Sequence, residues 1–171
     1  MKKITVKNLP TVRGKYTENA DLSALTWFRV GGPADVLFSP ANEDDLGAFL
    51  KETPEEIPVH VMGVGSNLLV RDGGVRGVVI RFGSPFRQVQ VDGMRVTAGA
   101  GCIDAQVAKA AAKAGVAGLE FFRGVPGTIG GAIRIVVSRS LGSEMVRVAM
   151  MPGMAQAKEE RSGMKARPDS P

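Results

Sequence analysis

The apolar positions of the chain fall into short runs that are separated by turns rich in glycine and proline. Runs of this length, bounded by turn residues, are typical of strands, and they occur at Ala34–Phe38, Val59–Met62 and Val78–Ile80. Leu68–Val70 forms a further strand-like run, and Val89–Val96 predicts a hairpin that turns at Asp92-Gly93. The pattern therefore predicts a sheet of short strands.

Two other stretches have the spacing of helices. The first starts at Asn42, which precedes three acidic residues and suits a helix cap, and its buried stripe would be Leu46, Phe49 and Leu50. The second is rich in alanine, runs from about Asp104 to Ala114 and ends at Gly115. Helices and strands in this order predict an α+β fold.

Both ends of the chain differ from the middle. Residues 1–20 are polar and mixed, which predicts a mobile or loosely docked lead-in. After Arg134 the alternation stops, and five of the eight methionines lie in residues 135–171. We expect this last stretch to be a mostly disordered or weakly helical tail.

Composition and charge limit the classes of function that the chain could have. The chain has 171 residues, of which 44% are hydrophobic, enough for one domain or two small lobes. Of the net charge of +5, residues 134–171 carry +3 (seven basic residues, four acids), which leaves +2 for the rest (15 basic, 13 acidic). An almost neutral folded part argues against nucleic acid as a partner.

The residue types also limit the chemistry and the location. His60 and Cys102 are the only histidine and cysteine, which excludes a Cys/His metal site and an internal disulfide. We expect both to be structural. No apolar run reaches 18 residues, and charged residues interrupt the first seven before a signal sequence could form. We therefore expect a cytoplasmic protein without a membrane partner.

Two glycine-rich loops are candidates for chemistry. Gly63–Asn67 could bring several N–H groups to one anion, although such a turn on its own is more often a plain connection. It is neither a Rossmann nor a Walker A sequence. Gly124–Gly131 could lie flat against a planar ligand or simply start a helix packed on a sheet. A third glycine-rich element, Ala98–Gly101, is equally ambiguous alone.

Several segments taken in order indicate one protein family far more specifically than any single loop does. These segments are Phe28–Asp35, Gly63–Gly74, Gly99–Gly101, Gly118–Glu120 and Gly124–Ala132. In this order they resemble the successive signatures of the UDP-N-acetylenolpyruvoylglucosamine reductases, over about two thirds of the chain. The resemblance implies a vanillyl-alcohol-oxidase-type (PCMH-type) FAD-binding fold with a smaller lobe at about 21–76 and part of a larger one at about 77–134.

The resemblance also implies a set of cofactor-binding residues. The loop around the FAD pyrophosphate would consist of Gly63, Val64, Gly65, Ser66, Asn67 and Leu68. The segment along the isoalloxazine and ribityl part would contain Gly124, Pro126, Gly127, Thr128, Gly130 and Gly131. The implied reaction uses NADPH to reduce the flavin, which then reduces UDP-N-acetylglucosamine-enolpyruvate to UDP-N-acetylmuramate for peptidoglycan.

The chain departs from the family pattern after Ala132. The expected Met-Asn-Ala-Gly motif is replaced by Arg134–Leu141, and the third, substrate-binding domain with its catalytic serine and glutamate is missing. We assign no catalytic residue, not even Arg134 or Ser138. The sequence thus predicts a truncated, poorly soluble, catalytically incomplete form of the reductase. The alternatives are another FAD-linked oxidase of the same fold and a non-catalytic flavin-binding module.

Overall fold

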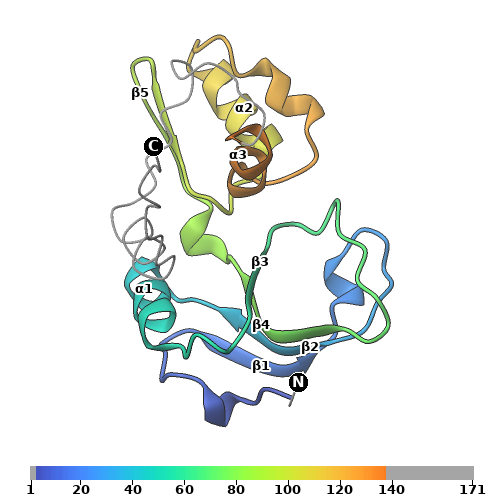
Figure 1. Cartoon of the computed structure of the whole chain (residues 1–171). Helices are drawn as coiled ribbons and strands as arrows, with labels where there is room; N and C mark the ends of the chain where they lie inside the picture. Colours follow the sequence, from blue (N-terminus) through green and yellow to red (C-terminus); the bar gives the residue numbers. More distant parts are fainter. Residues whose placement is uncertain (1–2, 138–171) are drawn as a thin grey trace, which may run out of the picture.

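The structure is a computed structural model that describes residues 3–137. Its first lobe is a four-stranded sheet in the order β1-β2-β4-β3 (Figure 1). β2, β4 and β3 are parallel, and β1 is antiparallel to β2 at the edge. The strands are β1 (Lys15–Ala20), β2 (Ala34–Ser39), β3 (Val59–Met62) and β4 (Val75–Arg81), and the helix after β2 is α1 (Glu43–Glu52).

Helix α1 begins and packs as its sequence predicts. The side chain of Asn42 accepts a hydrogen bond from the N–H of Asp45 at 2.9 Å, which caps the helix. Leu46 and Phe49 are buried against the sheet. The main core lies between this helix and the sheet, and it contains Val36, Phe38, Leu46, Phe49, Ile57, Val78, Ile80, Phe82 and Phe86.

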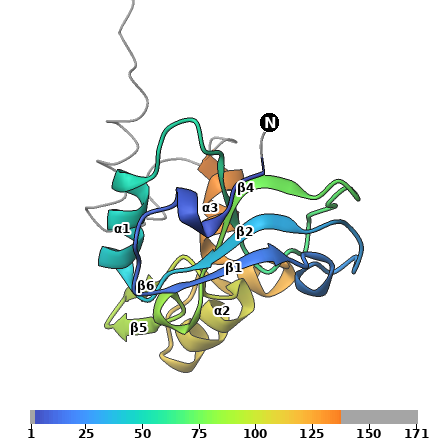
Figure 2. The same cartoon turned by 90° about the horizontal axis from the view of Figure 1, so that it is seen from below.

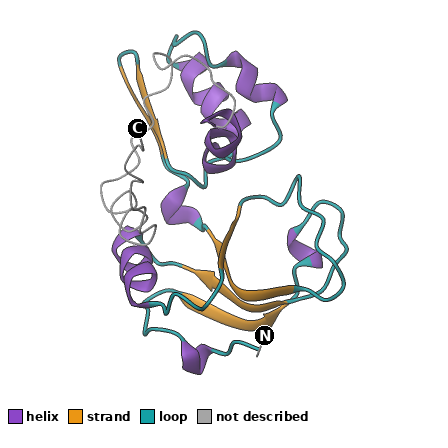
Figure 3. Ribbon diagram, viewed as in Figure 1, coloured by secondary structure: helices purple, strands orange, loops and turns teal. Residues whose placement is uncertain are grey.

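The second lobe follows a short 3-10 helix at Ser84–Phe86 and has its own core (Figure 3). It consists of the hairpin β5 (Val89–Asp92) and β6 (Arg95–Ala98), α2 (Asp104–Lys113), a 3-10 helix (Glu120–Gly124) and α3 (Ile129–Val137). Cys102, Val107 and Phe122 are buried in this core. Figure 1 shows this lobe apart from the sheet, and in Figure 2, which is seen from below, it lies behind the sheet.

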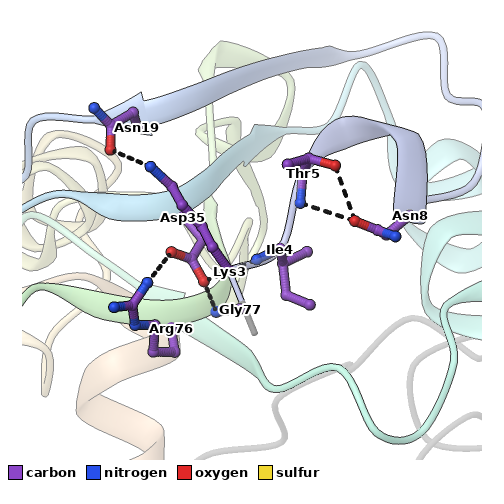
Figure 4. A network of polar contacts seen from close by, with 8 residues as sticks. All are labelled: Lys3, Ile4, Thr5, Asn8, Asn19, Asp35, Arg76 and Gly77. Carbon is purple, nitrogen blue, oxygen red and sulfur yellow. Dashed lines mark hydrogen bonds and ion pairs between the residues drawn. The ribbon is translucent and has the colours of Figure 1, made fainter. Parts of the chain in front are cut away.

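The lead-in, for which the sequence predicts a mobile or loosely docked segment, is a structured part of the first lobe over residues 3–20. Residues 15–20 form β1, and the segment before them is held by two buried carboxylates. Asp35 accepts from the N–H groups of Ile4 and Gly77 and pairs with Arg76 at 3.0 Å (Figure 4). Asp45 accepts from Ala41 and from Arg13 and Gly14 of the lead-in. The polar composition of the lead-in favours a mobile segment in the sequence, because the hydrogen-bond partners that hold it, Asp35 and Asp45, lie far along the chain.

Two local expectations need correction. The hairpin turns at Gly93-Met94 rather than at Asp92-Gly93, because Val91 pairs with Val96 and Asp92 with Arg95. This register leaves Met94 exposed at the tip, where Gly93 takes φ +55°. Leu68–Val70 is a loop rather than a strand: it runs beside Gly31, and the N–H of Gly32 donates to the carbonyl of Arg71.

Candidate functional site

The three glycine-rich elements of the sequence meet between the two lobes. The Ser66 hydroxyl donates a 2.7 Å hydrogen bond to the carbonyl of Pro126, which ties Gly63–Asn67 to the second loop. The second loop is in turn bound to the third, because Gly130 N–H donates to Ala100 and Ile129 N–H to Cys102. Loops that lie 60 residues apart in sequence therefore build one site.

The first loop depends on glycine at two positions. Gly65 has φ +67°, a conformation that other residues rarely adopt, and an added Cβ would lie 2.6 Å from the carbonyl oxygen of Leu25. A Cβ on Gly63 would lie 2.8 Å from Oγ1 of Thr128 in the second loop. The close approach of the two loops therefore requires the small residue at Gly63.

A row of backbone donors is available in the first loop. Within the described residues, the N–H groups of Val64, Gly65, Ser66 and Asn67 donate no hydrogen bond, although Gly65 is buried. Backbone N–H groups of folded proteins are almost always paired with protein, water or ligand. Successive N–H groups in a glycine loop form a typical anion-binding site.

A pocket of about 440 Å³ opens beside these donors. It is lined by Trp27, Val64, Ile103, Ala105, Arg123, Gly124, Val125, Pro126 and Gly127. Its size is in the range of small-molecule sites, and its lining is mostly apolar. Sequence reasoning did not single out Trp27, Ile103, Ala105, Arg123 or Val125. The one signal for Trp27 was that it is the only tryptophan of the chain.

Only some of the site residues that the sequence predicts line this pocket. Thr128 is buried, and Gly130 and Gly131 belong to the first turn of α3, so the second predicted loop ends as a helix start. Asn67 and Leu68 are exposed and do not line the pocket. The sequence-predicted residues that line the pocket are Val64, Gly124, Pro126 and Gly127.

Two titratable groups lie behind the loops in the second lobe. Burial raises the pKa of Asp104 to about 6, and neither carboxyl oxygen has a hydrogen-bond partner within the described residues. A Cβ on Gly127 would lie 2.9 Å from its Oδ2. Burial also raises the pKa of the Cys102 thiol, which donates to the carbonyl of Gln88 at 3.1 Å. Cys102 is thus a core residue, as the sequence predicts.

Comparisons with known proteins agree with this architecture. Residues 34–144 match the family described as FAD binding domain. The crystal structure of UDP-N-acetylenolpyruvylglucosamine reductase from Thermus caldophilus superposes with a TM-score of 0.56 at 35% identity, over 72% of this chain and 42% of that one. None of the helices within residues 3–137 is long and apolar enough to cross a membrane.

Curated relatives give the same result at higher identity. UDP-N-acetylenolpyruvoylglucosamine reductase of Maricaulis maris is 66% identical over 128 residues, which is 74% of this chain and 41% of that protein. The enzyme of the same name from Paramagnetospirillum magneticum is 54% identical over 142 residues, or 83% of this chain and 46% of that protein. The chain thus spans less than half the length of these relatives.

The fold and the matched region define the class of protein: the chain belongs to the FAD binding domain family, with an α+β fold. More particularly, its matched part corresponds to the N-terminal FAD-binding part of the UDP-N-acetylenolpyruvoylglucosamine reductases. Both the fold class and the family resemblance that the sequence predicts are therefore confirmed.

Proposed function

We propose that the chain binds FAD between its two lobes, with the pyrophosphate on the loop of Gly63–Asn67. One observation carries this proposal: four successive N–H groups without an acceptor in the described residues lie in a loop whose glycines allow close approach. Such donors compensate negative charge without a lysine or a helix. The exposed guanidinium of Arg123, on the same pocket, adds positive charge.

The riboflavin part would lie along the second loop. Gly124, Pro126 and Gly127 line the pocket, and their small or rigid backbone leaves room for a planar ring. The hydrogen bond from Ser66 to Pro126 fixes this segment relative to the pyrophosphate loop. Thr128, Gly130 and Gly131 would support the loop from behind, and Leu68 would contribute through its backbone.

For the reaction, we infer a role in reducing UDP-N-acetylglucosamine-enolpyruvate with NADPH in peptidoglycan synthesis, in the cytoplasm. When bound, FAD supplies the hydride-transfer chemistry, and the residues described here bind and orient it. The names of the relatives and the fold support this family reaction. The chain spans about two fifths of the length of those relatives, so the family reaction as a whole is a proposal for this chain.

Two spectroscopic measurements test these proposals in turn. Protein purified with added FAD and then desalted should keep the flavin absorbance at about 450 nm. Loss of all flavin from folded protein would contradict FAD binding. Bleaching of the band of the loaded protein by NADPH without oxygen, followed by reoxidation with the enolpyruvyl substrate, would support the family reaction. A band that NADPH leaves unchanged would contradict this reaction for the chain and leave FAD binding intact.

A further inference from the structure

The only tryptophan of the chain lies on the wall of the candidate site. Trp27 lines the pocket together with Val64 and Gly124–Gly127, yet its side chain is 63% exposed. A tryptophan offers more apolar area than any other residue, and its burial stabilises proteins. A large exposed aromatic group on a pocket wall is therefore typical of a surface that a ligand covers.

The backbone of Trp27 is held in place against the loop of N–H donors. Its N–H donates to the carbonyl of Gly65 at 3.1 Å, and the preceding Thr26 is buried. Two residues later, Arg29 has φ +52°, in the left-handed region that favours glycine. Strained backbone of this kind is found where the surroundings fix a segment, often beside a ligand.

These positions restrict what could cover the indole. Gly65, whose carbonyl accepts from Trp27, belongs to the loop that is proposed to bind a pyrophosphate. The N–H groups of Val64–Asn67 in that loop donate no hydrogen bond within residues 3–137. A dinucleotide bound there carries a planar ring system on each side of its phosphates. Both ring systems present a π face, and stacking of such rings on aromatic side chains contributes measurably to affinity.

We propose that Trp27 forms a stacking wall of the ligand site, where its indole covers a planar heteroaromatic ring of the bound dinucleotide. The inference rests on the proposed function, because it takes FAD as the ligand. It goes further in assigning a binding role to a residue outside both glycine loops.

The test is calorimetric titration of the full chain with FAD, for the wild type and three variants. Trp27→Leu should weaken binding about tenfold, whereas Trp27→Phe, which keeps a ring, should stay within about threefold. Phe28→Leu is the matched control, because Phe28 is also exposed but does not line the pocket. It should bind as the wild type does. Equal urea midpoints for all four proteins would show that folding is unaffected.

Two smaller probes identify the stacked ring. If Trp27→Leu weakens ADP binding to the same extent, the ring is adenine, and if it weakens FMN binding instead, the ring is isoalloxazine. Unchanged FAD affinity in Trp27→Leu, or equal losses in the Leu and Phe variants, would overturn the inference and leave FAD binding intact. Wild-type protein that binds no FAD at all would overturn both proposals.

Discussion

The hydroxyl of Ser66 donates a hydrogen bond of 2.7 Å to the carbonyl of Pro126, 60 residues further along the chain. This bond joins the two loops that the sequence marks as cofactor-binding. It also joins the two lobes, since Ser66 follows the sheet strand β3 and Pro126 precedes α3. The relative position of the two loops therefore depends in part on one side chain.

Removing this hydroxyl should loosen the site. A single hydrogen bond contributes about 1 kcal/mol, so we expect Ser66→Ala to weaken FAD binding about fivefold. The matched control is Ser84→Ala, because Ser84 is exposed and its hydroxyl makes no hydrogen bond within residues 3–137. Calorimetric titration of both variants measures the difference. Equal affinities would show that the bond does not position the loop.

Gly65 should tolerate no side chain. Alanine there would be forced into φ +67° and would meet the Leu25 carbonyl oxygen at 2.6 Å. The conformation alone costs about 1–2 kcal/mol, so Gly65→Ala should destabilise the protein by at least about 2 kcal/mol in urea unfolding. Gly73→Ala is the control, since nothing lies within 4 Å of its added Cβ. A Gly65→Ala protein as stable as the control would refute this account of the loop.

Asp45 should anchor the lead-in in a pH-dependent way. Burial alone would raise its pKa, but the N–H groups of Ala41, Arg13 and Gly14 outweigh burial and lower the pKa. A lowered folded-state pKa stabilises the protein above about pH 4, and the effect is lost as the pH falls through the folded pKa. Asp45→Asn should therefore cost about 1–3 kcal/mol at pH 7 and progressively less below pH 4.

The control for this anchor is Asp44→Asn. Asp44 lies in the same first turn of α1 and shares its helix-end electrostatics, but it is exposed. Denaturant unfolding across pH 3–7 compares the two variants at about 0.5 kcal/mol precision. If the two substitutions cost the same at pH 7, the bonds to the lead-in contribute nothing to stability.

Asp104 should have the opposite effect to Asp45 on the pH dependence of stability. Its pKa is raised to about 6 by burial, so the folded state favours the protonated form. The corresponding stability is present below about pH 4, where the unfolded chain is also protonated, and it is lost as the pH rises from about 4 to about 6. Asp104→Asn should thus stabilise the protein at pH 7 by up to about 3 kcal/mol and have little effect at pH 4.

Unfolding measurements at the two pH values check the assignment for Asp104. Asp92→Asn serves as the control, because Asp92 is exposed on the hairpin of the same lobe. A destabilised Asp104→Asn protein at pH 7 would mean that the ionised carboxylate has a partner in the folded protein.

The sequence predicts local structure well where the signal is local. The Asn42 cap, the Leu46 and Phe49 stripe and the alanine-rich helix at Asp104 each depend on neighbouring residues, and each is found. The docking of the lead-in could not be predicted, because Asp35 and Asp45 bind segments 31 or more residues away. The strand expected at Leu68–Val70 is not formed, because the segment beside it, around Gly31 and Gly32, is a loop and not a strand with which it could pair.

In the candidate site, too, the local features could be predicted and the distant contacts could not. The spacing of the glycines indicates the two loops, because the backbone conformations open to a glycine depend on that residue itself. Trp27 and Arg123 gave no such signal, since only the fold brings them to the pocket with Val64. The burial of Asp104, whose carboxyl oxygens have no hydrogen-bond partner within residues 3–137, gave no signal either, because only the fold brings Gly127 of the second loop against it.

The most direct test of FAD binding is calorimetric titration of the full 171-residue chain with FAD. We expect saturable binding of about one FAD per chain, which Gly65→Ala abolishes and Gly73→Ala leaves intact. A wild-type protein that unfolds cooperatively, and is therefore folded, but releases no heat and retains no flavin would contradict FAD binding by this chain.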